Sequence, residues 1–327
     1  MTYRPRLGVA NLSVAQQARR GLLQRIERYP RAIHAARLLF FALALIGGLL
    51  GLWDLWLHLT SDPISDARAY SEAASRLNHG LPLYPPNIDP STNQAYLYPP
   101  LLAILLRPLA LLPYYVFALT WEILVVGTFL LTIRQLGGGF RTYVAIGILG
   151  IPFGWALSVG QAHVPMTLLL AIGQPWSIAF AANIKIFPAL IALWWIGRRD
   201  YQSFIAFVGY SFLFGIVQLV LDPEGTFAFL KGSVGLGQIG QVRNFSPYVW
   251  ASPLAWSALV LTGILVTVGL ARTRYGWAAA VVLSTLSPPR LLVYMLTGLL
   301  AAVREPRVSM GPVEAPDAAS AYVASAR

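Results

Sequence analysis

The chain has 327 residues, of which 57% are hydrophobic and only 11% are charged, whereas soluble domains carry about 25% charged residues. A chain of this composition cannot cover its surface with polar groups, so we exclude a soluble globular protein. It contains no cysteine, which excludes disulfides, thiolate metal sites and thiol nucleophiles. The net charge of +11 comes from arginines before residue 38 and at the ends of apolar runs, a pattern that indicates membrane topology and not nucleic-acid binding.

The first 35 residues are strongly basic. Before the first apolar run, one acid, Glu27, stands against eight arginines: Arg4, Arg6, Arg19, Arg20, Arg25, Arg28, Arg31 and Arg37. By the positive-inside rule, residues 1–35 lie in the cytoplasm. No small-residue cleavage site follows the run 36–59, so we read it as a retained helix. We predict a membrane domain over residues 36–303 and a disordered tail over 304–327, which is rich in Ala, Ser and Pro.

Apolar runs recur along the membrane domain, where crossing a hydrocarbon core takes about 20 residues. With arginines marking their cytoplasmic ends, we predict passages at 36–59, 114–133, 143–159, 164–196 (broken), 204–221, 251–270 and 276–303. Prolines limit 98–113 to a re-entrant or tilted half-helix, and the prolines at 288 and 289 leave the last run open as one span or a shallow hairpin. The predicted fold is all-α: a polytopic bundle of about eight or nine transmembrane or re-entrant helices with external loops at 60–100 and 222–250.

The first external loop contains a predicted helix. Ser65 or Asp66 has the character of an N-cap, and Gly80 stands just past the expected end. Asp66 and Tyr70 share the least polar stripe of this helix. Two interpretations of Asp66 remain open: it caps the helix, or it is a carboxylate at the lipid–water boundary that takes a proton from a hydroxyl group.

Other charged residues lie inside or beside apolar runs. Lys185 and Glu122 are at similar predicted depth, so Lys185 either pairs with Glu122 or faces a phosphate. Arg243, in the second external loop, is either a phosphate contact or a solvated loop charge. His79 and His163 lack the spacing and neighbouring carboxylates of a metal site, so we expect ordinary hydrogen bonds there and predict neither metal nor cofactor.

Several motifs follow in a fixed order. They are Asp66 with Tyr70, Gly80-Leu81-Pro82-Leu83-Tyr84, Tyr98-Pro99-Pro100-Leu101, Pro108-Leu109-Ala110-Leu111-Leu112-Pro113, Gly160-Gln161, Lys185-Ile186-Phe187-Pro188 and Asn244-Phe245-Ser246. In order and spacing, the chain from about Asp66 to Ser287 resembles glycosyltransferase family 87, the polyprenol-phosphate-mannose-dependent mannosyltransferases of the GT-C superfamily.

The resemblance implies a GT-C-like bundle and an inverting transfer of a sugar, with mannose the expected one. The donor would be a polyprenyl-phosphate sugar and the acceptor a hydroxyl group of a lipid or glycan, at the outer face of the cell membrane and among its lipids. Asp66 would be the general base. The donor phosphate would contact Lys185, Arg243 and Arg290, and the substrate pocket would include Tyr70, Tyr98, Gln161 and Asn244.

The chain departs from the family pattern in two places. After Ser287-Pro288, the family's Trp and His are replaced by Leu291 and Val293, and we expect Arg290 to substitute as a phosphate partner. The stretch 164–196 is also shorter than in the family. The rival interpretation is therefore an inactive relative or a carrier of lipid-linked sugars. A secondary transporter is disfavoured because no inverted repeat is apparent.

Overall fold

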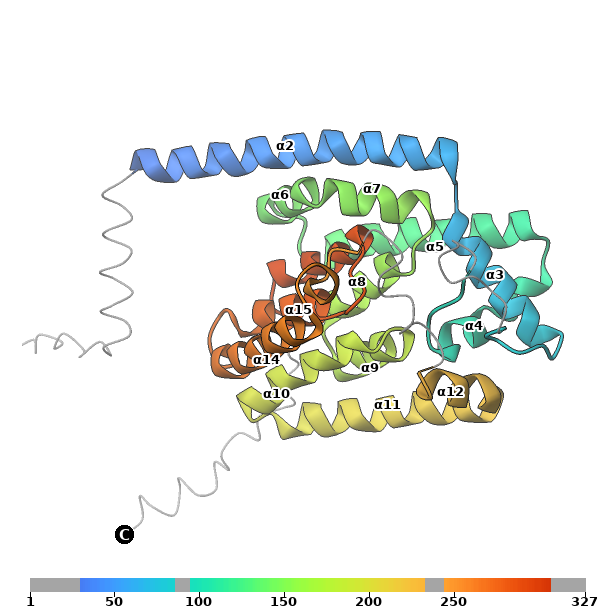
Figure 1. Ribbon diagram of the computed structural model, residues 1–327. Coiled ribbons are helices and arrows are strands. Elements are labelled where there is room, and N and C mark those ends of the chain that lie inside the picture. Colours follow the sequence, from blue (N-terminus) through green and yellow to red (C-terminus); the bar gives the residue numbers. More distant parts are fainter. Residues whose placement is uncertain (1–29, 86–94, 233–243, 307–327) are drawn as a thin grey trace, which may run out of the picture.

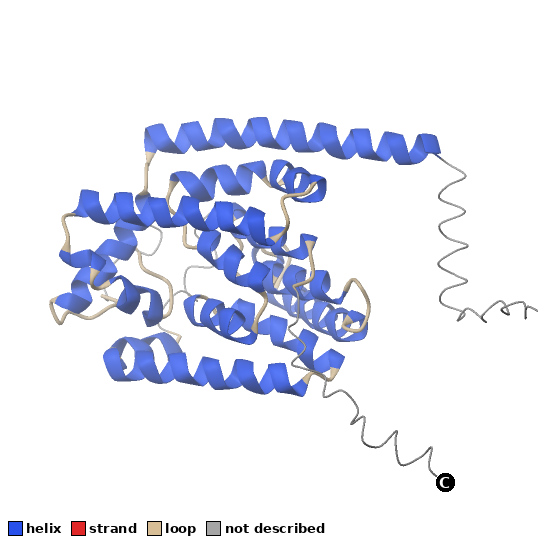
Figure 2. Ribbon diagram, turned by 180° about the vertical axis from the view of Figure 1, so that it is seen from behind, coloured by secondary structure: helices blue, strands red, loops and turns tan. Residues whose placement is uncertain are grey.

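The computed structural model describes residues 30–85, 95–232 and 244–306, with side chains from residue 34 onward. Every regular element in these ranges is a helix (Figures 1 and 2), so the predicted all-α class is confirmed. Residues 1–29, Arg243 and residues 307–327 lie outside the described ranges. The predictions for the basic segment, for that arginine and for most of the tail therefore stay predictions.

Four helices of the described chain are long and apolar enough to cross a membrane: α2 (Pro30–Ser61), α5 (Tyr114–Gln135), α11 (Tyr201–Leu221) and α14 (Pro253–Leu270). A fifth crossing is formed if α6 (Phe140–Ile148) and α7 (Gly150–Ser158), which meet at a bend of 73°, count as one span. Only 6% of the apolar window in α2 is buried inside the protein, as expected for a helix that faces lipid. The predicted count of eight or nine membrane elements is not confirmed.

Glycine and proline divide the remaining apolar sequence into shorter helices. The stretch 164–196 forms α8 (His163–Ile172), α9 (Pro175–Ile184), the 3-10 helix η2 (Phe187–Ile191) and α10 (Ala192–Arg198). Gly173 ends α8 with a φ of 62°, a left-handed conformation that favours glycine. The last run forms α15 (Gly276–Leu286) and the 3-10 helix η4 (Val293–Val303), which pack against each other on either side of the prolines. It is therefore not one straight span.

Helix α2 packs along α6 and α7 through glycines (Figure 1). A Cβ atom added to Gly150 would lie 2.0 Å from the carbonyl oxygen of Gly47, and one added to Gly154 would lie 2.2 Å from that of Gly51. Such small residues let membrane helices approach backbone to backbone. This packing places the end of α2 beside the end of α7.

Several short helices gather at one end of the molecule (Figure 1). They are α3 (Ser65–Asn78), α4 (Pro100–Leu106), the 3-10 helix η1 (Leu109–Leu111) and α12 (Pro223–Leu230); α13 (Pro247–Trp250) precedes α14. Gln218 of α11 accepts a hydrogen bond from the Leu101 amide at 3.1 Å and donates one to Asn183 Oδ1 at 2.8 Å. These bonds join α4 and α9 to α11. The buried cluster under α3 includes Tyr70 and Trp121.

Candidate functional site

The chain turns sharply between α2 and α3, and this turn fixes Asp66. Ile64 has a left-handed φ of 56° and occupies the N-cap position of α3 without a side-chain cap. The Ile64 and Asp66 amides instead donate to the carbonyls of Ser158 and Val159 at the end of α7, at 2.9 and 3.0 Å. The predicted capping role of Ser65 or Asp66 is therefore wrong, because carbonyl groups of another helix satisfy the helix start. The predicted helix end is confirmed, since Gly80 has a φ of 66° just after it.

Four predicted site residues meet around one side-chain amide. Gln161, in the link between α7 and α8, is only 1% exposed and donates from Nε2 to Asp66 Oδ2 at 2.5 Å. Its Oε1 accepts from the hydroxyl groups of Tyr70 and Tyr98, at 2.7 and 2.5 Å. A hydroxyl group donates to an amide oxygen and not to the NH₂ group, so the two tyrosines fix which end of the amide faces Asp66.

The surroundings of Asp66 favour a carboxyl group that changes its protonation near neutral pH. Burial raises its pKa to about 7, against the lowering effect of the Lys185 and Arg290 charges and of the hydrogen bond from Gln161. The residue as a whole is half-buried, so Asp66 is not fully enclosed. A general base works best when its pKa lies near the working pH. Asp66 has that property.

Lys185 lies beside the Tyr98 ring. Its Nζ is 3.2 Å from His163 Nε2, 3.5 Å from Met295 Sδ and 5.6 Å from the centroid of the Tyr98 ring. No carboxylate of the described chain forms an ion pair with it. The alternative of a Glu122–Lys185 pair is therefore wrong: Glu122 Oε2 is buried and has no hydrogen-bond partner among the described residues.

His163 is a candidate that sequence reasoning missed as a site residue. It is the first residue of α8, is 3% exposed, and its ring lies 5.3 Å from that of Tyr294. Its Nδ1 is buried without a hydrogen-bond partner among the described residues. The feature of the sequence that could have identified it is its position two residues after Gln161. The imidazole thus lies within hydrogen-bond distance of the Lys185 amine and keeps a second polar atom unused.

Arg290 follows the two prolines of the last run and belongs to the same site. It is half-buried, its Nε has no hydrogen-bond partner among the described residues, and its charge acts on Asp66. Asn244 holds this segment by its backbone, because Nδ2 donates to the Pro289 carbonyl and Oδ1 accepts from the Leu291 amide, both at 2.9 Å. The structure therefore places Asn244 behind the loop that carries Arg290, as a support for it.

A small cavity of about 20 Å³, room for about one water molecule, adjoins Lys185 and His163. Its other walls are largely apolar and include Leu170, Phe187 and Met295. The Lys185 amine and the His163 imidazole thus border apolar side chains. Together with Asp66, the arrangement provides a base and, apart from it, a cationic partner for a departing anion.

Comparison with known proteins gives the following matches. The family model of glycosyltransferase family 87 matches residues 96–306. A polyprenol-phosphate-mannose-dependent alpha-(1-2)-phosphatidylinositol pentamannoside mannosyltransferase of Mycobacterium tuberculosis is 26% identical over 278 residues, covering 75% of this chain and 64% of that protein. The protein of the same name from Mycolicibacterium smegmatis is 26% identical over 261 residues, covering 65% of this chain and 64% of that protein. The chain thus spans less than two thirds of either relative. No solved structure matches it significantly.

Proposed function

Since the chain belongs to glycosyltransferase family 87, we propose that it transfers a sugar, mannose in the first instance, from a polyprenyl-phosphate donor to a hydroxyl group of a lipid or glycan acceptor. The observation that carries the proposal is that Asp66 and Lys185 meet in one site through Gln161 and Tyr98: Gln161 hydrogen-bonds both Asp66 and the Tyr98 hydroxyl group, and Lys185 Nζ lies 5.6 Å from the centroid of the Tyr98 ring. The names of the two relatives support a polyprenol-phosphate-mannose donor. For the acceptor, we propose a lipid that carries hydroxyl groups.

The transfer follows from the chemistry of these groups. Asp66 takes the proton of the acceptor hydroxyl, and the oxygen attacks the anomeric carbon from the face opposite the phosphate. The bond from that carbon to the phosphate oxygen breaks, and its electron pair leaves with the lipid phosphate. Lys185, Arg290 and His163 stabilise the charge that develops there. The anomeric configuration inverts, and the proton remains on Asp66.

The membrane orientation is part of the same proposal. The basic segment before residue 38 supports a cytoplasmic N-terminus, so that α2 carries the chain out and α3 lies at the outer face of the cell membrane. The multi-pass domain over residues 36–303 would then expose its site where lipid-linked sugars are used. Membrane lipids would surround α2, α11 and α14, whose apolar side chains are largely exposed.

The rival function, an inactive relative or a carrier of lipid-linked sugars, rests on the replacement of the expected histidine by Val293. His163 weakens this rival, because it brings an imidazole to Lys185 from a different helix. The phosphate side of the site therefore has an imidazole, a lysine and an arginine despite the replacement. We favour the enzyme for this reason.

The test is the transfer of radiolabelled mannose from polyprenyl-phosphate mannose to endogenous lipids, in membranes that contain the full chain. We expect Asp66→Asn to lose at least about a hundredfold in rate. Glu72→Gln, which removes an exposed acid from the same helix, should transfer at the wild-type rate. Equal transfer by wild type and Asp66→Asn would remove Asp66 as the base. A wild-type protein that binds the donor without consuming it would favour the carrier.

A further inference from the structure

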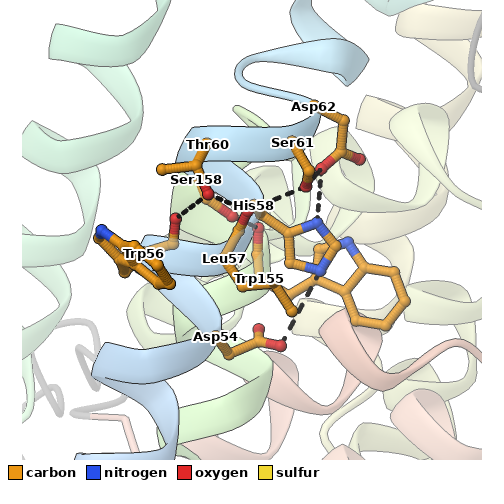
Figure 3. A network of polar contacts seen from close by, with 9 residues as sticks. All are labelled: Asp54, Trp56, Leu57, His58, Thr60, Ser61, Asp62, Trp155 and Ser158. Atoms are coloured by element: carbon orange, nitrogen blue, oxygen red, sulfur yellow. Dashed lines mark hydrogen bonds and ion pairs between the residues drawn. The ribbon is translucent and has the colours of Figure 1, made fainter.

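Three titratable side chains line the end of α2 that leads into α3 (Figure 3). Asp54, His58 and Asp62 follow at intervals of four residues, which places them on one side of the chain. His58 Nδ1 is 2.7 Å from Asp62 Oδ1, and His58 Nε2 is 3.9 Å from Asp54 Oδ1. We call these residues the α2 column. They lie before residue 96, where the family match begins.

The column faces the protein and not the lipid. The His58 ring stacks on Trp155 of α7, with centroids 4.9 Å apart and planes 15° apart, and Trp155 in turn contacts the Tyr294 ring at 6.0 Å. Asp54 Oδ2 is buried without a hydrogen-bond partner among the described residues. Ionisable groups at membrane depth are costly to keep there, which makes the column a candidate for function.

Asp66 follows four residues after Asp62 but lies in the next helix, α3. The chain passes from Asp62 to Asp66 through the left-handed turn at Ile64, along the end of α7, where the Asp66 amide donates to Val159. The Asp62 charge raises the pKa of Asp66, so the two carboxyl groups act on each other. Asp62 Oδ1 accepts from Ser61 at 2.9 Å as well as contacting His58, while Oδ2 has no hydrogen bond within the described chain. One Asp62 oxygen is thus available to exchange a proton.

The proposed sugar transfer requires a group that takes a proton away from Asp66. Each turnover leaves a proton on Asp66, and this proton must go before the carboxylate can act again. While donor and acceptor fill the site, water reaches Asp66 less easily than in the empty protein. The protein does not fully enclose His58 and Asp62, since their side chains are 17% and 31% exposed.

We propose that Asp62 and His58 form the proton exit from Asp66, and this inference rests on the function proposed above. The Asp66 carboxyl group gives its proton to the Asp62 carboxylate, which gives it to the imidazole of His58. The imidazolium is held between Asp54 and Asp62 until it loses the proton to water. Only O–H and N–H bonds form and break, so no further reactant is needed. Imidazole suits the step because one ring nitrogen can accept a proton while the other donates one.

Two carboxylates are the charged groups beside His58 in the described chain. Within the described chain its ionic partners are Asp54 and Asp62, both from its own stretch of chain. Helix α7 contributes Trp155 and Ser158 near it (Figure 3), neither of which titrates as an acid or base here, and α6 forms no ion pair with the column. The alternative role is structural: the column would only stabilise the packing of α2 against α7. A test must separate proton transfer from this structural role.

Chemical rescue makes that separation. His58→Ala leaves a slot against the Trp155 ring that free imidazole can fill. In membranes that contain the full chain, we expect His58→Ala to transfer mannose about tenfold more slowly than wild type at pH 6.5 and to recover most of the rate when imidazole is added. Thr60→Ala, on the same turn of α2, should match wild type with and without imidazole. Asp62→Asn should be slow and gain nothing from imidazole, because the step before His58 is lost.

The outcomes distinguish this inference from the proposed function. If Asp66→Asn abolishes transfer while His58→Ala keeps the wild-type rate and pH profile, the proton exit is overturned and the proposed function stands. A slow His58→Ala protein that imidazole does not restore indicates the structural role and also overturns the exit. If Asp66→Asn transfers normally, the proposed function itself fails. Restoration by imidazole shows at once that the variant is folded and that proton transfer was missing.

Discussion

Gln161 donates a 2.5 Å hydrogen bond to Asp66, although 95 positions separate the two residues in the chain. The hydroxyl groups of Tyr70 and Tyr98 hold the opposite end of the same amide. Burial and the neighbouring charges dominate the pKa of the proposed base, and the Gln161 amide, held by the two tyrosines, adds a hydrogen bond that favours the carboxylate. This relationship leads to the first two predictions.

The rate of transfer should depend on pH through Asp66. Its pKa is raised to about 7, and only the deprotonated carboxylate can accept a proton. Transfer should therefore be low at pH 5.5, rise through about pH 7 and level off above about pH 8. The measurement is the pH profile of the maximal rate with saturating donor. A profile that is flat from pH 5.5 to 8.5 would contradict Asp66 as the titrating base.

Gln161→Leu should move this profile to higher pH. The hydrogen bond from Gln161 favours the charged carboxylate and lowers the pKa of Asp66, so its loss raises that pKa further. We expect the midpoint to rise by up to about one pH unit, with the largest loss of rate below the wild-type midpoint. A uniform loss at all pH values would instead indicate a damaged fold.

Lys185→Met should weaken the use of the donor phosphate. Loss of the ammonium group removes a charge-assisted contact, so we expect transfer to fall about a hundredfold, with a higher KM for the donor. Lys185→Arg should retain part of the rate. Lys231→Met, which changes the chain's other lysine at an exposed position, is the matched control. Equal rates for both methionine variants would remove Lys185 from the site.

His163 should matter through its imidazole and not only through its volume. His163→Leu leaves Lys185 without its hydrogen-bond acceptor, and we expect a drop of about tenfold in rate over donor KM. His163→Asn preserves an acceptor of similar size and should lose less. The measurement is steady-state transfer at several donor concentrations. If the leucine variant matches wild type, the imidazole plays no part in donor binding.

Packing of α2 can be tested without touching the site. Gly150→Ala would place a Cβ atom 2.0 Å from the Gly47 carbonyl oxygen, so the helices must move apart. We expect a loss of about 1–3 kcal/mol in the free energy of unfolding, seen as a lower melting temperature in detergent. Gly48→Ala, with nothing within 4 Å of the added atom, is the control and should melt like wild type. Similar melting of both variants would contradict the close contact.

The sequence was most informative where one residue decides a local conformation. The helix after the first long span and its end at Gly80 follow from a polar, alanine-rich stretch with a glycine behind it. The capping prediction for Asp66 was wrong because it treated the helix alone. In the structure, carbonyl groups of α7 satisfy the first amides of α3, a contact that no local pattern contains.

Counting spans from apolar runs was less successful, for a physical reason. Hydrophobicity indicates that a segment avoids water, but it does not distinguish lipid from the apolar interior of a helical bundle. The helix α8, the segment Phe187–Arg198, α15 and η4 are apolar but too short to cross a membrane by length. Similarly, the depth of Glu122 and Lys185 suggested a pair, but depth along a helix does not say which way a side chain points.

The unpaired cation at Lys185 has a consequence for how the protein shares its membrane. A site that holds its donor through the phosphate and the hydrocarbon chain, which the loaded and the spent carrier lipid share, also binds the spent carrier. We therefore expect free polyprenyl phosphate to inhibit transfer competitively, in an assay where it is titrated against the donor. The rate of sugar transfer would then depend on the ratio of sugar-loaded to free carrier lipid. This dependence would link the protein to the reaction that attaches the sugar to that lipid.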